Sequence, residues 1–170
     1  ARSVGYVKEE EHQHQLLTDR VHTMVANLAN KLKHSGPKDK VKEAELFNRY
    51  QNDLILAAKA HAELIMWEAF TTALKSIRDK ESLQILTWLR DLYGFTLLEE
   101  NMAWYVVNGR LSSSRAEAIT EYIDGRLLPR LRPHVESLVD AFLLRPELIG
   151  TNLAADEAAR QASKKTLVRN

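Results

Sequence analysis

The chain has 170 residues, contains no cysteine, and carries 24 basic against 23 acidic side chains, for a formal net charge of +1. This length suits one domain with a single core, and the near-neutral charge offers no overall field to attract nucleic acid or an anionic membrane. The lack of cysteine excludes a disulfide framework, a thiolate metal site and a cysteine nucleophile. No apolar run approaches the roughly 20 residues of a membrane-spanning helix. We therefore expect a single domain over residues 1–170, with neither nucleic acid nor a membrane as a partner.

The first half of the sequence predicts two long amphipathic helices. Apolar residues recur at three- and four-residue steps from Leu16 to Leu32, which predicts a helix that ends before the Ser-Gly-Pro at 35–37. The same spacing continues after Asp39, from Leu46 to Phe70, and predicts a second helix that ends near Arg78.

The third predicted helix runs from about Ser82 to Val107 and stops at Asn108-Gly109, since both residue types tolerate the left-handed conformation of a helix end. Strict alternation of apolar and polar residues is missing, so strands have little support. Short polar links join neighbouring helices and favour antiparallel packing. The predicted fold is all-α: an up-and-down antiparallel bundle of about four long helices with a short C-terminal tail.

The fourth helix is predicted to start in the segment "SSSRAE". Ser114 is followed three residues later by Glu117, the spacing of a capping box. Pro129 and Pro133 should kink or split this helix, because each lacks an amide donor and clashes with the preceding turn.

The last part of the chain is predicted to hold a piece of the core and a docking surface. Leu138 and Phe142 are four residues apart and share a helix face, with Val139 beside it, so these three residues are predicted to be core. The following loop still carries apolar side chains, which should lie against another surface. Leu148, Ile149 and Leu153 are predicted to form this docking surface.

A metal centre is not supported by the spacing of histidine and carboxylate residues. A di-iron bundle needs two Glu-x-x-His motifs on separate helices. Glu9 with His12 and Glu11 with His14 have this spacing, but both pairs lie in one charged segment and no second segment repeats the motif. His12 and His14 are therefore interpreted as solvated residues at a helix start.

His61 is the strongest candidate for acid–base chemistry, because it interrupts an apolar stripe and Glu68 follows two helical turns later. A histidine in such a stripe is more often a buried packing residue held by a hydrogen bond, and this interpretation is preferred. The sequence shows no nucleophile elbow and no glycine-rich phosphate loop. We therefore predict no catalytic, cofactor-binding or metal-binding residue in this chain.

Three segments resemble the C-terminal helical domain of the acyl-CoA oxidases, flavin enzymes related to the acyl-CoA dehydrogenases. The first is "FNRYQNDLILAAKAHAELIMWEAF" at 47–70, with an Ala-His pair at 60–61; the second is "LRDLYGFTLLEENMAWYVVNGRLS" at 89–112. The third and most specific is "LRPHVESLVDAFLLRPELIGTNLA" at 131–154. The resemblance covers about residues 28–161.

The resemblance implies a piece of a larger FAD-dependent enzyme that converts acyl-CoA and oxygen to trans-2-enoyl-CoA and hydrogen peroxide in fatty acid β-oxidation. In that family the FAD site, the catalytic glutamate and most of the acyl-CoA cleft lie upstream of this domain. The implied cofactor is FAD in the full-length enzyme and none in this segment alone. The implied partners are the upstream catalytic domains of the same enzyme and a second copy in a homodimer.

Two features of the ends bear on this expectation. The first residue is Ala1 rather than methionine, which fits a piece of a longer protein. The sequence ends at 167–170 without a peroxisomal Ser-Lys-Leu signal, which favours a bacterial, cytoplasmic enzyme. The alternative is a stand-alone helical protein-interaction module without catalytic activity.

Overall fold

The computed structural model describes residue 5 and residues 7–35 and 40–142. The chain divides into two compact units, Ala1–Arg132 and Pro133–Asn170, and each is described by itself. The single domain over residues 1–170 stays a prediction. In the described residues all regular structure is helical, which confirms the all-α class. None of the described helices is long and apolar enough to cross a membrane.

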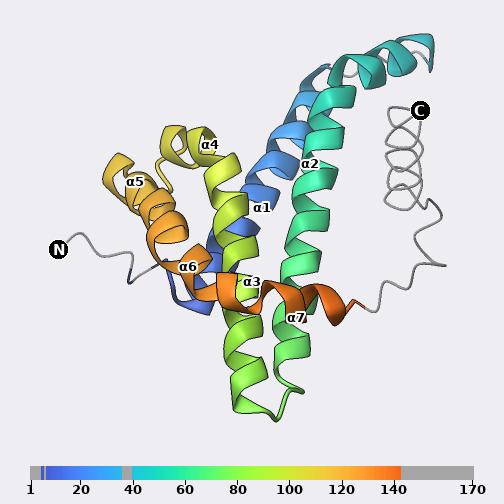
Figure 1. Ribbon diagram of the computed structural model, residues 1–170. Helices are drawn as coiled ribbons and strands as arrows, with labels where there is room; N and C mark the ends of the chain where they lie inside the picture. Colours follow the sequence, from blue (N-terminus) through green and yellow to red (C-terminus); the bar gives the residue numbers. More distant parts are fainter. Residues whose placement is uncertain (1–4, 6, 36–39, 143–170) are drawn as a thin grey trace, which may run out of the picture. The chain divides into compact units, whose positions relative to one another are not determined.

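Three long helices come first, followed by a series of short ones (Figure 1). The long helices are α1 (Glu10–Ser35), α2 (Lys40–Leu74) and α3 (Lys80–Glu100). The short elements are α4 (Met102–Val107), α5 (Ser113–Tyr122), the π-helix η1 (Ile123–Leu127), α6 (Leu128–Leu131), the 3₁₀-helix η2 (Arg132–His134) and α7 (Val135–Asp140). The predicted fourth helix is thus divided into several pieces.

Helices α1 and α2 lie side by side, and α3 packs on both of them (Figure 1). The buried side of α2 repeats every three or four residues, with Ala57, Ala60, Leu64 and Trp67. On its other side α3 contacts α5, η1 and α6. The fully buried core residues Phe95, Leu98, Tyr105, Ile119 and Leu127 come from α3, α4, α5 and η1, so the short elements complete the core that α3 begins.

The predicted third helix is interrupted at Asn101, so its continuous course to Val107 was wrong. The Asn101 Nδ2 atom donates to the backbone oxygen of Leu97 at 2.8 Å. An asparagine that bonds its own backbone competes with the helical ladder, which explains the break between α3 and α4. The predicted end at Asn108-Gly109 is confirmed, because Gly109 has a φ of 66° that favours glycine.

The N-cap of α5 is Ser112, so the predicted capping box at Ser114 and Glu117 was wrong. Ser112 has extended backbone angles, and its hydroxyl accepts from the Arg115 amide at 3.3 Å. Ser114 already lies inside the helix and is not in a position to cap it. Three serines in a row give the sequence three candidate caps, and only the backbone decides among them.

Replacing Ser112 with alanine should lower the free energy of unfolding by about 1 kcal/mol, the usual loss for an N-cap hydroxyl. Ser114→Ala should cost clearly less, because Ser114 lies inside the helix and its hydroxyl lies 3.2 Å from the exposed Ser112 hydroxyl. Urea denaturation of both variants measures the difference. A larger loss of stability for Ser114→Ala would support the predicted capping box of Ser114 and Glu117 instead.

The prolines split the last helical region, as predicted. Pro129 lies in the first turn of α6, where its missing amide breaks no bond. Immediately before it the chain widens into η1, and the Leu128 amide donates to Ile123, five residues earlier. Pro133 lies in the 3₁₀-helix η2, which separates α6 from α7.

The predicted core residues of the last helix are not buried. Val139 and Phe142 are 54% and 71% exposed, and Leu138 is half-buried, so the core prediction for these residues was wrong. The four-residue spacing identified a shared face but carried no information on what covers that face. Leu148, Ile149 and Leu153 lie outside the described residues.

Candidate functional site

His61 does not lie in the core. Its side chain is exposed, so the prediction of a buried, hydrogen-bonded histidine was wrong. The buried side of α2 passes through Ala60 and Leu64, one step around the helix from His61. Glu68, the predicted partner of His61, instead lies beside a histidine of α1: its Oε1 is 2.7 Å from His14 Nε2.

His14 links α1 to α2 while its side chain stays 44% exposed, so it is solvated as predicted, and the contact with Glu68 is the feature that the sequence did not predict. Its ring stacks on the Trp67 indole with a centroid distance of 5.7 Å and an interplanar angle of 21°. His12 Nδ1 lies 3.1 Å from Glu9 Oε2 within the first turn of α1. Among the described residues no group of three or more histidine and carboxylate side chains is placed to hold a metal ion.

A groove of about 570 Å³ lies along α1 and α2 at the His14–Glu68 pair. Its lining is mixed polar and apolar and includes three glutamates; it comprises Glu10, Glu11, His14, Trp67, Glu68, Thr71, Thr72 and Lys75. Trp67 is only 2% exposed, so its indole forms the floor.

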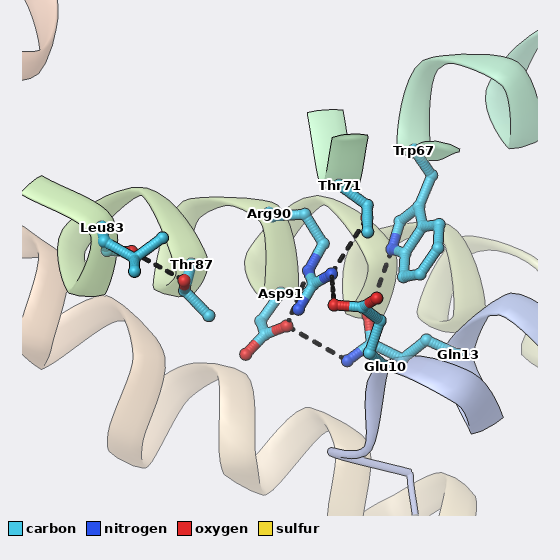
Figure 2. Close-up of polar contacts among 8 residues, drawn as sticks. All are labelled: Glu10, Gln13, Trp67, Thr71, Leu83, Thr87, Arg90 and Asp91. Atoms are coloured by element: carbon cyan, nitrogen blue, oxygen red, sulfur yellow. Dashed lines mark hydrogen bonds and ion pairs between the residues drawn. The ribbon is translucent and has the colours of Figure 1, made fainter. Parts of the chain in front are cut away.

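Beneath this groove, Arg90 of α3 joins three helices through a buried polar network (Figure 2). Arg90 is only 4% exposed. Its Nη1 donates to Glu10 Oε2 at 3.0 Å and to Thr71 Oγ1 at 2.9 Å, and its Nε donates to Asp91 Oδ1 at 3.0 Å. The guanidinium carbon lies 5.0 Å from the centroid of the Trp67 ring. Charge-assisted bonds and a cation–π contact therefore hold this buried cation.

Gln13 closes the network from α1 (Figure 2). It is fully buried; its Nε2 donates to Asp91 Oδ1 at 3.3 Å, and its Oε1 accepts from Trp67 Nε1 at 3.3 Å. Gly94 of α3 lies against this bond: a Cβ there would crowd Gln13 Oε1 and come within 2.8 Å of Trp67 Nε1. The network thus depends on a glycine that lets α3 approach the other two helices.

Burial raises the pKa of Asp91, and the nearby Arg90 only partly offsets this. The folded protein therefore binds the Asp91 proton more tightly than the unfolded chain does. In the unfolded chain the Asp91 carboxyl group has its ordinary pKa of 3.8. The contribution of Asp91 to stability is full below pH 3.8 and is lost as the pH rises through the higher pKa of the folded state.

Asp91→Asn cannot titrate at this position and isolates that contribution. We expect the free energy of unfolding of the wild type to fall relative to the variant as the pH rises across this window, and the difference to be constant above it. Urea denaturation of both proteins at a series of pH values measures the difference. A wild type that gains stability relative to the variant with rising pH would contradict the assignment.

A second buried ion pair joins α1 to α2. Arg20 Nη1 lies 3.1 Å from Glu63 Oε2, and both residues are less than 10% exposed. The hydroxyl of Tyr93 on α3 donates to the Glu63 backbone oxygen at 3.3 Å. Tyr105 lies close enough for both charges to act on its hydroxyl, whose pKa is raised mainly by burial. The ion pairs of Arg90 and the Arg20–Glu63 pair hold the three long helices together. Their role is therefore structural.

Helix α2 carries apolar side chains that are well exposed in the part of the chain that the structure describes. Leu54, Ile55, Leu56, Ile65 and Met66 are 39% to 60% exposed. An apolar groove of about 590 Å³ runs between α1 and α2 on this part of the molecule; it is lined by Val21, His22, Val25, Ala26, Leu28, Leu54, Ala57, Ala58, His61 and Leu64. We call Leu54, Ile55, Ile65 and Met66 the outer face of α2. Leu54 and Ile65, like Ile55 and Met66, are eleven residues apart, which is about three helical turns and keeps each pair on one side of the helix. A helix that is apolar all round is typical of burial on both sides, and the sequence "LILAAKAHAELIMW" already contained this signal.

The family described as acyl-CoA oxidase matches residues 9–156, which is most of the chain. No match was found among the curated proteins. The matched range includes α1, α2 and α3, and so contains both buried ion pairs and the outer face of α2. The chain belongs to the acyl-CoA oxidase family.

Proposed function

We propose that this chain is the C-terminal structural and assembly domain of an FAD-dependent acyl-CoA oxidase. The whole enzyme would convert acyl-CoA to trans-2-enoyl-CoA and hydrogen peroxide in cytoplasmic fatty acid β-oxidation. FAD and most of the acyl-CoA would be held by upstream catalytic domains of the same polypeptide, and this segment alone would hold no FAD. Family membership favours this proposal over a stand-alone interaction module.

The observation that carries the proposal is the outer face of α2. Full burial of one such side chain is worth about 1.5–3 kcal/mol, and contiguous exposed apolar residues mark interaction surfaces in soluble proteins. The residues lie on one long helix that the Arg20–Glu63 pair holds rigidly to α1. We propose that the upstream catalytic domains cover this face, and that the enzyme is a homodimer.

Ile65→Ser combined with Met66→Ser tests the proposal, because both side chains are about half exposed or more and leave the core intact. The isolated 170-residue chain should keep its melting temperature and self-associate less. The full-length oxidase with the same changes should assemble less tightly and lose FAD more readily. Sedimentation velocity and flavin absorbance measure both effects.

Val107→Ser is the matched control, since Val107 is 83% exposed and lies on α4, away from the outer face of α2. It should leave assembly and flavin content unchanged. A double variant whose full-length enzyme assembles and retains FAD like the control would refute the proposed role.

A further inference from the structure

Met66 carries the most exposed sulfur-containing side chain of the protein. The chain has three methionines and no cysteine, so three thioethers are its only sulfur groups. Met66 is 60% exposed, whereas Met24 packs against the core and Met102 is half-buried. Peroxides oxidise thioethers as well as thiolates, and exposed groups react first. Met66 is therefore the sulfur group of this chain that a peroxide in solution reaches most easily.

The hydroxyl of Tyr93 on α3 lies beside the Met66 sulfur. Its Oη is 3.8 Å from Met66 Sδ and 3.3 Å from the backbone oxygen of Glu63. A tyrosine hydroxyl has one proton and donates to one of these acceptors at a time. Burial raises the pKa of Tyr93, so the hydroxyl keeps this proton at neutral pH. The contact holds the thioether against α3 at one point, while the rest of the side chain is open to solvent.

The reaction of the proposed enzyme releases the oxidant, hydrogen peroxide. A lone pair of Met66 Sδ attacks one peroxide oxygen, a sulfur–oxygen bond forms, and the O–O bond breaks. The hydroxide that leaves takes the proton from the transferred oxygen and becomes water. The sulfur loses two electrons and the peroxide gains them, so one thioether and one peroxide give one methionine sulfoxide and one water.

A sulfoxide at this position changes the outer face of α2, to which Met66 belongs. Oxidation converts a flexible apolar side chain into a polar one. A partner that docks on Ile55, Ile65 and Met66 would have to bury the new oxygen, and burial of a polar group without a full set of partners is unfavourable. Docking and oxidation therefore oppose each other: docking covers the sulfur, and the sulfoxide disfavours docking.

We propose that Met66 is an oxidation site, at which hydrogen peroxide forms methionine sulfoxide and thereby weakens docking at the outer face of α2. The oxidation site stands on the exposure of Met66 and on its place in the chain, and its effect on docking rests on the proposed function. Methionine sulfoxide reductases reverse the modification, so the effect on docking is reversible.

Peptide mapping by mass spectrometry tests the oxidation site. The 170-residue chain is diluted until it is monomeric and treated with a limiting amount of hydrogen peroxide. The sulfoxide of Met66 should form several-fold faster than that of Met24 or Met102, because both of these are more buried. Equal rates at the three positions, or faster oxidation of Met24 or Met102, overturns the site. This result does not depend on the proposed function, since no upstream domain is present.

The full-length oxidase tests the effect on docking. It is treated with hydrogen peroxide and then examined by sedimentation velocity and flavin absorbance, each variant against its own untreated sample. Oxidation of the wild type should weaken assembly about 10-fold, the effect of burying one polar group without a partner, and should release FAD. Met66→Leu should not respond, because leucine fills a similar volume and forms no sulfoxide. Met102→Leu, a half-buried position on α4, is the matched control and should respond as the wild type does.

Return of assembly after treatment with methionine sulfoxide reductases supports the proposal, and assembly that stays weak after reduction of the sulfoxide overturns it. Equal losses in the wild type and Met66→Leu, or no loss in the wild type, also overturn the effect on docking. The Ile65→Ser, Met66→Ser variant keeps this result apart from the proposed function. If that variant assembles weakly while peroxide has no effect, the docking face stands and its control by peroxide falls. If it assembles like Val107→Ser, the proposed function itself falls.

Discussion

Replacing Arg90 with methionine should lower the free energy of unfolding by about 3–5 kcal/mol, the range measured when one partner of a buried ion pair is removed. Methionine fills similar space but donates no hydrogen bond. Asp91 would remain buried without its cation, and Thr71 and Glu10 would lose a donor. The free energy of unfolding of a small domain is about 5–15 kcal/mol in total. This single change should therefore remove a large part of the stability of the protein.

Arg110→Met is the matched control for that loss. Arg110 also lies near a carboxylate, 3.7 Å from Asp19, but it is 43% exposed. An exposed pair of this kind is worth less than about 1 kcal/mol. Urea denaturation at one pH gives both values. Equal losses for the two variants would show that the Arg90 network contributes little to stability.

Gly94→Ala should lower the free energy of unfolding by about 2 kcal/mol. The new methyl group would crowd Gln13 Oε1 and lie 2.8 Å from Trp67 Nε1, and both side chains are buried and bonded to each other. Overpacking of this kind costs up to about 3 kcal/mol. The better helix propensity of alanine returns about 1 kcal/mol.

Gly125→Ala separates the two contributions. A Cβ at Gly125 meets nothing within 4 Å, so only the conformational gain remains. The variant should be unchanged or more stable by up to about 1 kcal/mol. Thermal melts of the two alanine variants should therefore shift in opposite directions. A Gly94→Ala protein as stable as Gly125→Ala would mean that α3 can move away from the other helices at little cost.

The helices and some of their ends could be predicted from local sequence, where the chemistry of one residue fixes the end. Gly109 ends α4 through its left-handed backbone, and Pro129 divides the last helical region through its missing amide. Where several residues offer the same chemistry, as with the serines at 112–114, local sequence leaves the choice open.

The face that each helix buries could not be predicted in the same way. Helix α2 carries apolar residues around its whole circumference, so one periodic stripe placed His61 in the core, whereas Ala60 and Leu64 are the buried residues. The Arg90 network was missed for a different reason. Glu10, Thr71 and Arg90 are up to 80 residues apart and meet only when three helices pack, and no local pattern marks such a meeting.

Hydrogen exchange tests the central claim, that the outer face of α2 is an interface within the oxidase. The isolated 170-residue chain and the full-length enzyme are compared peptide by peptide. We expect amides of residues 54–66 to exchange more slowly in the full-length enzyme, because docking suppresses local opening. Residues 80–90 at the start of α3 serve as an internal reference that should change less. Equal exchange of residues 54–66 in the two proteins would contradict the claim.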